Sequence, residues 1–322
     1  MTQGQFISHC TADSLTLAAS ALTSGALVAM PTETVYGLGA DATNPAAVAR
    51  IYEVKGRPSD HPLIVHLADM QDMDLWASEI PDYAIELARS FWPGPMTLIL
   101  TRTDLAKDFI TGGQETVGLR VPNHAIALAL LAAFKKVGGK GVAAPSANRF
   151  GHVSPTTADA VREELSQYLS DEDLILDGGP SSVGVESTII DCTQSAPRIL
   201  RPGAITLEEI EEVTGLTVIH RGDLIRVSGA LEHHYAPEAK VLLDVTPEPG
   251  DGLIALKDYS TPVGVVRLAS PISNEDFARV LYGALRDADH QNIARVVVIQ
   301  PTGSDIATAI RDRLSRASAG RQ

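Results

Sequence analysis

Short apolar stretches alternate with helix-like stretches over the first 200 residues, and this alternation limits the possible fold more than any other feature of the sequence. Because strands and helices are mixed rather than grouped, the pattern is typical of an α/β domain. The predicted strands span residues 26–30, 63–67, 96–100, 117–121, 141–144, 174–176, 188–191 and 198–200. The predicted helices span residues 46–54, 81–91, 124–134 and 158–168.

Two of these helices have a recognisable beginning. Asn44 and Pro45 supply an N-cap and a proline in the first turn for the helix at 46–54. Thr156 and Asp159 resemble a capping box for the helix at 158–168, with Asp in the usual place of Glu or Gln.

The pattern changes near residue 205. A short acidic helix is predicted at 207–213, and the segment Ser228–Pro237 has the character of a linker. A second α/β pattern follows, with strands at 241–245, 253–256, 263–268 and 295–299 and helices at 275–289 and 304–316. We therefore expect a first domain over residues 1–205, a linker over 206–239 and a small α/β domain over 240–322.

The charge balance argues against a nucleic-acid-binding surface. The chain has 40 acidic and 26 basic residues, which gives a net charge of −14, and both predicted domains are acidic on balance. A local basic cleft stays compatible with these totals. Four arginines near the C-terminus are best explained as a solvated helix face: Arg311, Arg313, Arg316 and Arg321.

Other features predict a soluble, cytoplasmic protein without a membrane partner. Cys10 and Cys192 form no C-x-x-C pair, which argues against a disulfide framework and a structural zinc site and fits a reducing cytosol. The sequence has no run of 18 apolar residues, and its first residues lack the pattern of a signal peptide. Familiar catalytic templates are missing too: there is no P-loop, no H-E-x-x-H, no G-x-S-x-G and no complete G-x-G-x-x-G.

Polar segments lie directly beside the apolar strands, where α/β folds place their active sites. The first, Pro31–Gly39, offers two hydroxyls and a carboxylate, although an ordinary turn explains it equally well. The second contains Lys55 and Arg57 on either side of a glycine, which suits a polyphosphate but also fits a solvated basic turn. His66 ends the same segment, and a lone histidine there is more often structural.

Further candidates follow the later strands. Arg120 lies within a strand, so it needs either an anionic ligand or a carboxylate partner such as Glu33 or Glu115. Ser146 and Asn148 alternate after another strand and can aim at one point. Arg201 follows the last of these strands. Together with Lys55, Arg57 and Arg120 it could form a cluster of positive charge that holds ATP and its Mg²⁺.

Seven ordered segments resemble the L-threonylcarbamoyladenylate synthase family, of the YrdC type, over about residues 10–205. They read P-T-E-T-V-Y-G-L-G, K-G-R-P-x-x-x-P-L-I-V-H, W-P-G-P-x-T, G-L-R-V-P, P-S-A-N, E-S-T-I-I-D and L-R-P-G. The H-Y-A-P segment at 234–237 and the small domain after it are similar to the long, two-domain form. This resemblance implies a twisted mixed sheet with helices around an open cleft, joined to a small Rossmann-like C-terminal domain.

The family's activity implies that L-threonine, bicarbonate and ATP, with Mg²⁺ bound through the ATP phosphates, give L-threonylcarbamoyl-AMP and pyrophosphate. This nucleotidyltransferase reaction is the first step of threonylcarbamoyladenosine modification of tRNA, and a separate complex then transfers the group to tRNA. Carried over by motif, the threonine and carbamate pocket would contain Thr34, His66, Arg120, Ser146 and Ser187. The ATP contacts would be Lys55, Arg57, His61, Thr116, Asn148, Thr156, Arg201, His234 and Tyr235, with Lys55 and Arg57 acting in catalysis.

The sequence departs from the family at two places. His61 occupies a position where the family usually has Asn, and the linker lacks the basic residues of the usual S-P-G-M-K-Y-R-H-Y-A-P. No protein side chain is expected to bind the metal. The alternatives are an RNA-binding or ribosome-maturation module that uses the same cleft, and a carbamoyl-transfer domain of the hydrogenase-maturation type. The second alternative lacks support because the sequence has no zinc-finger or acylphosphatase-like region.

Overall fold

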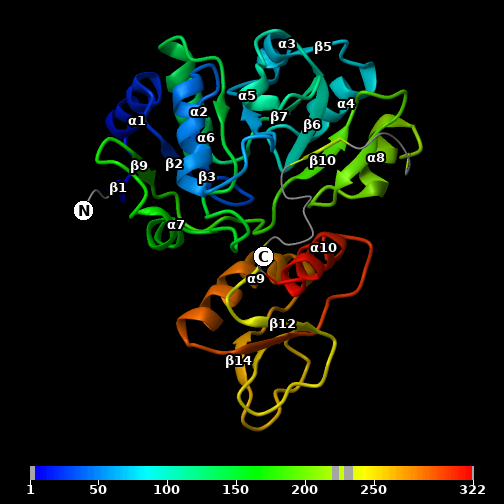
Figure 1. Ribbon diagram of the computed structural model, residues 1–322. Coiled ribbons are helices and arrows are strands. Elements are labelled where there is room, and N and C mark those ends of the chain that lie inside the picture. The colour runs from blue at the N-terminus through cyan, green and yellow to red at the C-terminus, as the bar shows by residue number, and fades with distance from the viewer. Residues whose placement is uncertain (1–3, 220–224, 228–234, 321–322) are drawn as a thin grey trace.

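A computed structural model describes residues 4–219, 225–227 and 235–320 of the chain. It contains one large mixed sheet of 11 strands and one small parallel sheet of 4 strands, each with its own helices. Figure 1 shows the two parts, with helices α9 and α10 of the smaller part facing the larger part. The predicted mixed α/β fold is confirmed.

The large sheet has the order β1-β9-β2-β3-β8-β4-β7-β6-β10-β11, and β5 pairs with β6 outside this path. Its strands are β1 (Gln5–Ile7), β2 (Val28–Met30), β3 (Gly37–Asp41), β4 (Ile64–His66), β5 (Ala77–Ser78), β6 (Met96–Arg102), β7 (Thr116–Arg120), β8 (Val142–Ala143), β9 (Leu174–Leu176), β10 (Thr188–Asp191) and β11 (Arg198–Arg201). Parallel and antiparallel pairs are mixed: β6 pairs with β10 in parallel and with β7 antiparallel.

The helices around this sheet begin and end at residues suited to those positions. They are α1 (Ala12–Ser24), α2 (Pro45–Lys55), α3 (Met73–Trp76), α4 (Asp82–Phe91), α5 (Asp108–Thr111), α6 (Ala125–Lys136), α7 (Ala158–Leu165) and α8 (Leu207–Thr214), with a 3₁₀ turn at Met70–Asp72. The Asn44 side chain accepts hydrogen bonds from the first amides of α2, as predicted. The predicted capping box of Thr156 and Asp159 is wrong: Thr157 caps α7 by accepting a hydrogen bond from the Ala160 amide, and alanine has no side chain to complete a box.

The small sheet has the order β12-β15-β13-β14, and all its pairs are parallel. Its elements are β12 (Lys240–Leu243), β13 (Gly252–Ile254), β14 (Val266–Ala269), α9 (Asn274–His290), β15 (Arg295–Val298) and α10 (Ala307–Ser318). The apolar faces of α9 and α10 pack on the sheet around Phe277, Leu281 and Ile310, all fully buried.

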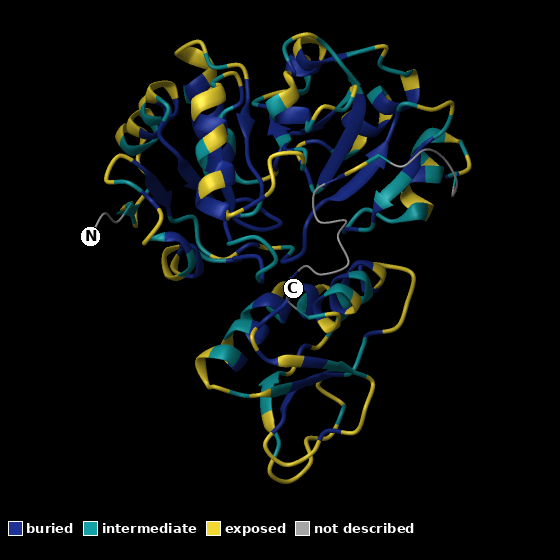
Figure 2. Cartoon of the chain, in the orientation of Figure 1, coloured by how far each residue is buried: buried dark blue, intermediate teal, exposed yellow. Residues whose placement is uncertain are grey.

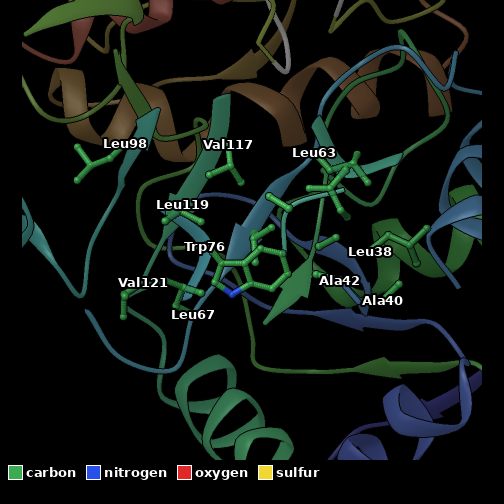
Figure 3. Close-up of a cluster of buried hydrophobic side chains, with 14 of the residues drawn as sticks. Leu38, Ala40, Ala42, Leu63, Leu67, Trp76, Leu98, Val117, Leu119 and Val121 are labelled. Carbon is green, nitrogen blue, oxygen red and sulfur yellow. The ribbon is translucent and has the colours of Figure 1, made fainter. Parts of the chain in front are cut away.

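The principal core lies between the large sheet and its helices. Figure 2 shows the strands buried and the outward faces of the helices exposed, as expected for amphipathic helices. In Figure 3, Leu38, Leu98, Leu119 and Trp76 gather in this core, and they come from strands β3, β6 and β7 and helix α3. The core fixes the strands whose ends carry the polar motifs.

The alternation along the sequence predicted the regular elements well, but not all of them. Every predicted strand and helix has a counterpart within a few residues. Helix α1 was not predicted from the sequence, and residues 37–39, which were expected to belong to a turn, begin strand β3. Glycine-rich β3 fits because Gly39 lies against backbone and Val142, where a Cβ would meet the Val28 carbonyl oxygen at 2.9 Å.

Part of the segment predicted as the linker packs against the larger part of the molecule. Helix α8 lies in the predicted linker, yet its Ile210 is fully buried in the principal core. We therefore propose that the first domain continues through Val218, which is also buried there. Among the described residues, no helix combines the length and apolar character needed to cross a membrane.

Candidate active site

A polar pocket opens at the strand ends of the large sheet, where the sequence motifs converge. Eight of the residues predicted from the sequence line it: Thr34, Arg57, His66, Arg120, Ser146, Ser187, Arg201 and Tyr235. The pocket encloses about 40 Å³, which suits a few water molecules, so larger ligands need its walls to move apart.

The turn after β2 carries two neighbouring buried hydroxyls, those of Thr32 and Thr34. The Thr32 hydroxyl donates to the Val35 carbonyl oxygen at 2.6 Å, and its oxygen lies 2.9 Å from that of Thr34. Thr32 thus stabilises the turn, and both threonines line the pocket.

Arg120 at the end of β7 faces the pocket and pairs with a carboxylate. Its Nη2 lies 2.8 Å from Oε1 of Glu33, and both side chains are buried. The contact is an ion pair without hydrogen-bond geometry, because no described group forms a hydrogen bond with either Glu33 oxygen or with Nη2. Of the two carboxylates considered from the sequence, the partner is Glu33, since Glu115 pairs with Arg102. Arg120 therefore retains donors for an anionic ligand.

His66 lies beside Arg120 in the neighbouring strand, and the two residues are paired in register. Burial, reinforced by the Arg120 charge, lowers the pKa of His66 to about 3. The imidazole is therefore neutral at physiological pH. Its Nδ1 is buried with no hydrogen-bond partner among the described residues, which leaves it available to a ligand.

Two further guanidinium groups approach the pocket from other elements. Arg57 follows α2 and donates to the Pro62 carbonyl oxygen at 2.9 Å, and burial lowers its pKa to about 10. Arg201 ends β11 and donates to the Ser187 carbonyl oxygen and hydroxyl at 2.9 and 3.2 Å. The Ser187 hydroxyl also lies 2.8 Å from that of Thr97. Three arginines thus surround one pocket of an acidic chain, which is the electrostatics an anionic ligand requires.

Lys55 lies behind the pocket rather than in it. As the last residue of α2 it is buried, and its Nζ donates to the Ser146 and Asn148 carbonyl oxygens at 2.6 and 2.5 Å. Burial, with the nearby Arg57 charge, lowers the pKa of Lys55 well below its usual value. Gly56 caps α2 with φ +61°, so it serves the helix end and not the approach of a ligand.

The structure does not bring the other predicted nucleotide contacts to the pocket wall. Asn148 is buried in the loop that carries Ser146, and its side-chain amide donates to the carbonyl oxygens of Arg149 and His152. His61 packs edge-on against Phe150, with ring centroids 5.4 Å apart. Thr116 borders a separate groove beside Val227, and Thr156 is buried but does not line the pocket. His234 lies outside the described residues.

The sequence analysis missed Glu186, the carboxylate that lines the pocket. It begins the E-S-T-I-I-D motif, next to the predicted Ser187, so its position in that motif was the available signal. Burial alone would raise the pKa of Glu186, but Arg313 and Arg201 hold it at about 2. Its contact with Arg313 corrects a second prediction, because Arg313 is fully buried and does not lie on a solvated helix face.

Comparisons with known proteins cover nearly the whole chain. Residues 20–203 match the family model Sua5_yciO_yrdC, described as "Telomere recombination", and residues 205–319 match Sua5_C, "Threonylcarbamoyl-AMP synthase, C-terminal domain". The threonylcarbamoyl-AMP synthase of Pyrococcus abyssi is 40% identical, over 94% of this chain and 93% of that protein. That of Bacillus subtilis is 39% identical, over 94% of this chain and 92% of that protein.

A similar structure has also been solved. The crystal structure of P. abyssi Sua5 complexed with L-threonine superposes with a TM-score of 0.86 at 37% identity. The match covers 99% of this chain and 98% of that one. The similarity therefore extends across both sheets.

Proposed function

The chain belongs to the threonylcarbamoyl-AMP synthase family, and on that premise we propose that it converts L-threonine, bicarbonate and ATP into L-threonylcarbamoyl-AMP and pyrophosphate. It is thus a nucleotidyltransferase and catalyses the first step of threonylcarbamoyladenosine formation in tRNA. The observation that carries the proposal is the convergence of Arg57, Arg120 and Arg201 with the hydroxyls of Thr34 and Ser187 in one pocket.

Arg120 is the group best placed to hold the threonine carboxylate. It is buried at the pocket wall, and its guanidinium geometry suits a bidentate contact with a carboxylate. The ion pair with Glu33 keeps Arg120 in place without using all of its donors. A P. abyssi relative binds L-threonine in its crystal structure, which supports the same ligand here.

The neighbouring neutral groups suit the amine and the carbamate. Thr34, Ser146 and Ser187 offer hydroxyls that can both donate and accept hydrogen bonds. His66, with its depressed pKa, adds an uncharged imidazole beside Arg120. Because none of these groups is cationic, they do not repel an amine that must lose its proton to react.

Arg57 and Arg201 are the groups we assign to the ATP phosphates, with Tyr235 beside them in the pocket wall. ATP exceeds the space that the pocket now encloses, so the walls must separate when it binds. We propose that Lys55 and Asn148 act on this site through the loop that carries Ser146, because both are bound to its backbone or buried beneath it.

The reaction needs positioning and charge neutralisation more than a covalent nucleophile. The threonine nitrogen forms a bond with the carbon of bicarbonate, and water leaves to give the carbamate. A carbamate oxygen then attacks the α-phosphorus, and the bond to pyrophosphate breaks in line. Arg57 and Arg201 would stabilise the charge that develops on the phosphates. Arg120 would orient the carbamate by binding the carboxylate of the threonine.

We propose that Mg²⁺ enters bound to the ATP phosphates. The described residues include no group of three His, Cys, Asp or Glu side chains arranged to hold a metal ion. Both oxygens of Glu186 already accept hydrogen bonds from other side chains. When bound, the ion would neutralise phosphate charge.

We propose that the product passes to a separate complex that modifies tRNA, and that the enzyme works in the cytoplasm. The free thiols of Cys10 and Cys192 support a reducing compartment. An RNA-binding module gains little support, because the pocket is small and its cations are buried. Tight tRNA binding in a salt titration, without ATP or threonine, would favour that alternative.

A substrate-omission assay tests the proposal. Pyrophosphate release should require ATP, L-threonine and bicarbonate together, and Arg57→Ala should reduce it by at least about 100-fold. Release that persists without threonine or bicarbonate would assign the pocket to another reaction. Arg89→Ala is a matched control, because Arg89 is an exposed arginine on α4 that pairs only with Glu86 among the described residues.

A further inference from the structure

The smaller part of the molecule reaches the active site through one buried carboxylate. Glu186 lines the pocket, and its Oε1 accepts a hydrogen bond from the Ser154 hydroxyl at 2.6 Å. Its Oε2 accepts from the Tyr282 hydroxyl at 2.9 Å and from Arg313 Nε at 2.8 Å. Tyr282 belongs to α9 and Arg313 to α10, so both helices of the smaller part hold this pocket residue.

Arg313 also joins two backbone segments of the site. Its Nη2 donates to the Pro202 carbonyl oxygen at 3.0 Å and, at 3.4 Å, to that of Glu186. Ser187 and Arg201 are the immediate neighbours of these two residues. One fully buried guanidinium therefore fixes the spacing of the segments that carry a proposed substrate hydroxyl and a proposed phosphate cation.

The charges explain why this contact matters for more than packing. Glu186 is influenced by two cations, Arg313 and Arg201, and both lower its pKa. Without Arg313, the carboxylate would be left with Arg201 as its remaining strong cationic neighbour. A guanidinium that neutralises a buried carboxylate has less of its charge to offer to a phosphate.

On the basis of the proposed function, we propose that Arg313 is a positioning residue of the active site: it binds Glu186, so that this carboxylate does not neutralise the Arg201 charge that would act on the ATP phosphates. The smaller part thus contributes to nucleotide binding although no described residue from 240 to 320 lines the pocket. Tyr235 supports the arrangement from the pocket side, since its ring stacks on Tyr282 and lies 5.4 Å from the Arg313 guanidinium.

The test measures substrate affinities separately. In Arg313→Met, the KM for ATP should rise by about tenfold or more, whereas the KM for L-threonine, which depends on Arg313 only through the position of Ser187, should change by less than about threefold. Loss of general packing would instead reduce the active fraction and leave both KM values alone. Arg313→Lys should give an intermediate KM for ATP, because a lysine keeps the charge but cannot span the carboxylate and both carbonyls.

Arg316→Met is the matched control. Arg316 lies one turn further along α10 and pairs with Asp312, which also contacts Arg313. Its replacement removes the same charge from the same helix, away from Glu186. We expect both KM values to remain within about twofold of the wild type.

The double variant Glu186→Gln/Arg313→Met tests the electrostatic argument itself. With the carboxylate neutralised, Arg201 no longer has a competing anion, so the KM for ATP should fall several-fold from that of Arg313→Met. This variant also avoids an unpaired buried charge, so it stays informative if Arg313→Met does not fold. In that case the KM for ATP of the double variant is compared with that of the single variant Glu186→Gln.

Two results would overturn the inference. One is an unchanged KM for ATP in folded Arg313→Met, and the other is an equal increase in both KM values that the double variant does not relieve. Calorimetric titration with ATP alone gives the same comparison without turnover. If the wild type binds ATP but releases no pyrophosphate, the proposed reaction fails, while the role of Arg313 is still tested by that titration.

Discussion

Replacing Lys55 with methionine distinguishes a structural role of this lysine from direct contact with phosphate. The Nζ group donates to two buried carbonyl oxygens, those of Ser146 and Asn148. Each unsatisfied buried carbonyl costs about 1–3 kcal/mol, and relief from burying the ammonium offsets part of this. We therefore expect Lys55→Met to lower the free energy of unfolding by about 2–5 kcal/mol.

Urea denaturation followed by circular dichroism measures this loss, and pyrophosphate release measures the effect on activity. Because the loop carries Ser146, activity should fall together with stability. Lys135→Met is the control: the Lys135 side chain is half exposed and pairs with Asp72, so its loss should cost no more than about 1 kcal/mol. A Lys55→Met protein of wild-type stability that releases no pyrophosphate would refute the structural role and restore direct phosphate contact.

Three other predictions follow from the geometry. The pKa of His66 is about 3 in the folded protein and 6.5 in the unfolded chain, so the free energy of unfolding should fall as the pH drops from 6.5 towards 3. His66→Gln should remove about 4–5 kcal/mol of that decrease, as measured by urea denaturation at each pH. Arg120→Met should weaken L-threonine binding at least about 100-fold by calorimetry, and unchanged affinity would place the carboxylate elsewhere. Gly56→Ala should cost about 1–2 kcal/mol because its φ is +61°. In Gly56→Ala the new Cβ would also lie 2.6 Å from the Arg149 guanidinium, and Gly138→Ala, at positive φ but with open space around it, is the comparison that isolates this contact.

The residues that line the pocket were easier to predict from the sequence than the residues that hold them in place. Residues that follow apolar strands, such as Thr34, Arg120 and Ser187, do converge, because strand ends in one sheet lie at a common edge. The partner of Arg120 could not be chosen from the sequence. The sequence offered Glu33 and Glu115 as examples of such a partner, and only the path of the turn after β2 brings Glu33 within 2.8 Å.

Arg313 shows why the contacts that hold the pocket residues in place could not be predicted from the sequence. Its contact with Glu186 joins residues 127 positions apart, and in the sequence it is one of several arginines on a helix. Periodicity assigns a residue to a face of a helix, but not to what covers that face. The covering surface is the larger part of the molecule.

Lys55 is a different case, because the signal was present. A predicted helix that ends near 54 and is followed by glycine indicates a left-handed C-cap, and such a cap places Lys55 in the last helical turn. Because Lys55 and Arg57 lie on either side of one glycine, both were instead predicted to bind phosphate. The structure separates them: Arg57 lines the pocket, and Lys55 holds the loop behind it.

The most direct test of the proposed function is isotopic. The purified protein is incubated with ATP, Mg²⁺, L-threonine and ¹³C-labelled bicarbonate, and the nucleotide products are identified by mass spectrometry. Our account predicts an adenylate that contains the threonine mass and one labelled carbon, formed together with pyrophosphate. An adenylate of threonine without the labelled carbon, or AMP formation that does not depend on threonine, would contradict it.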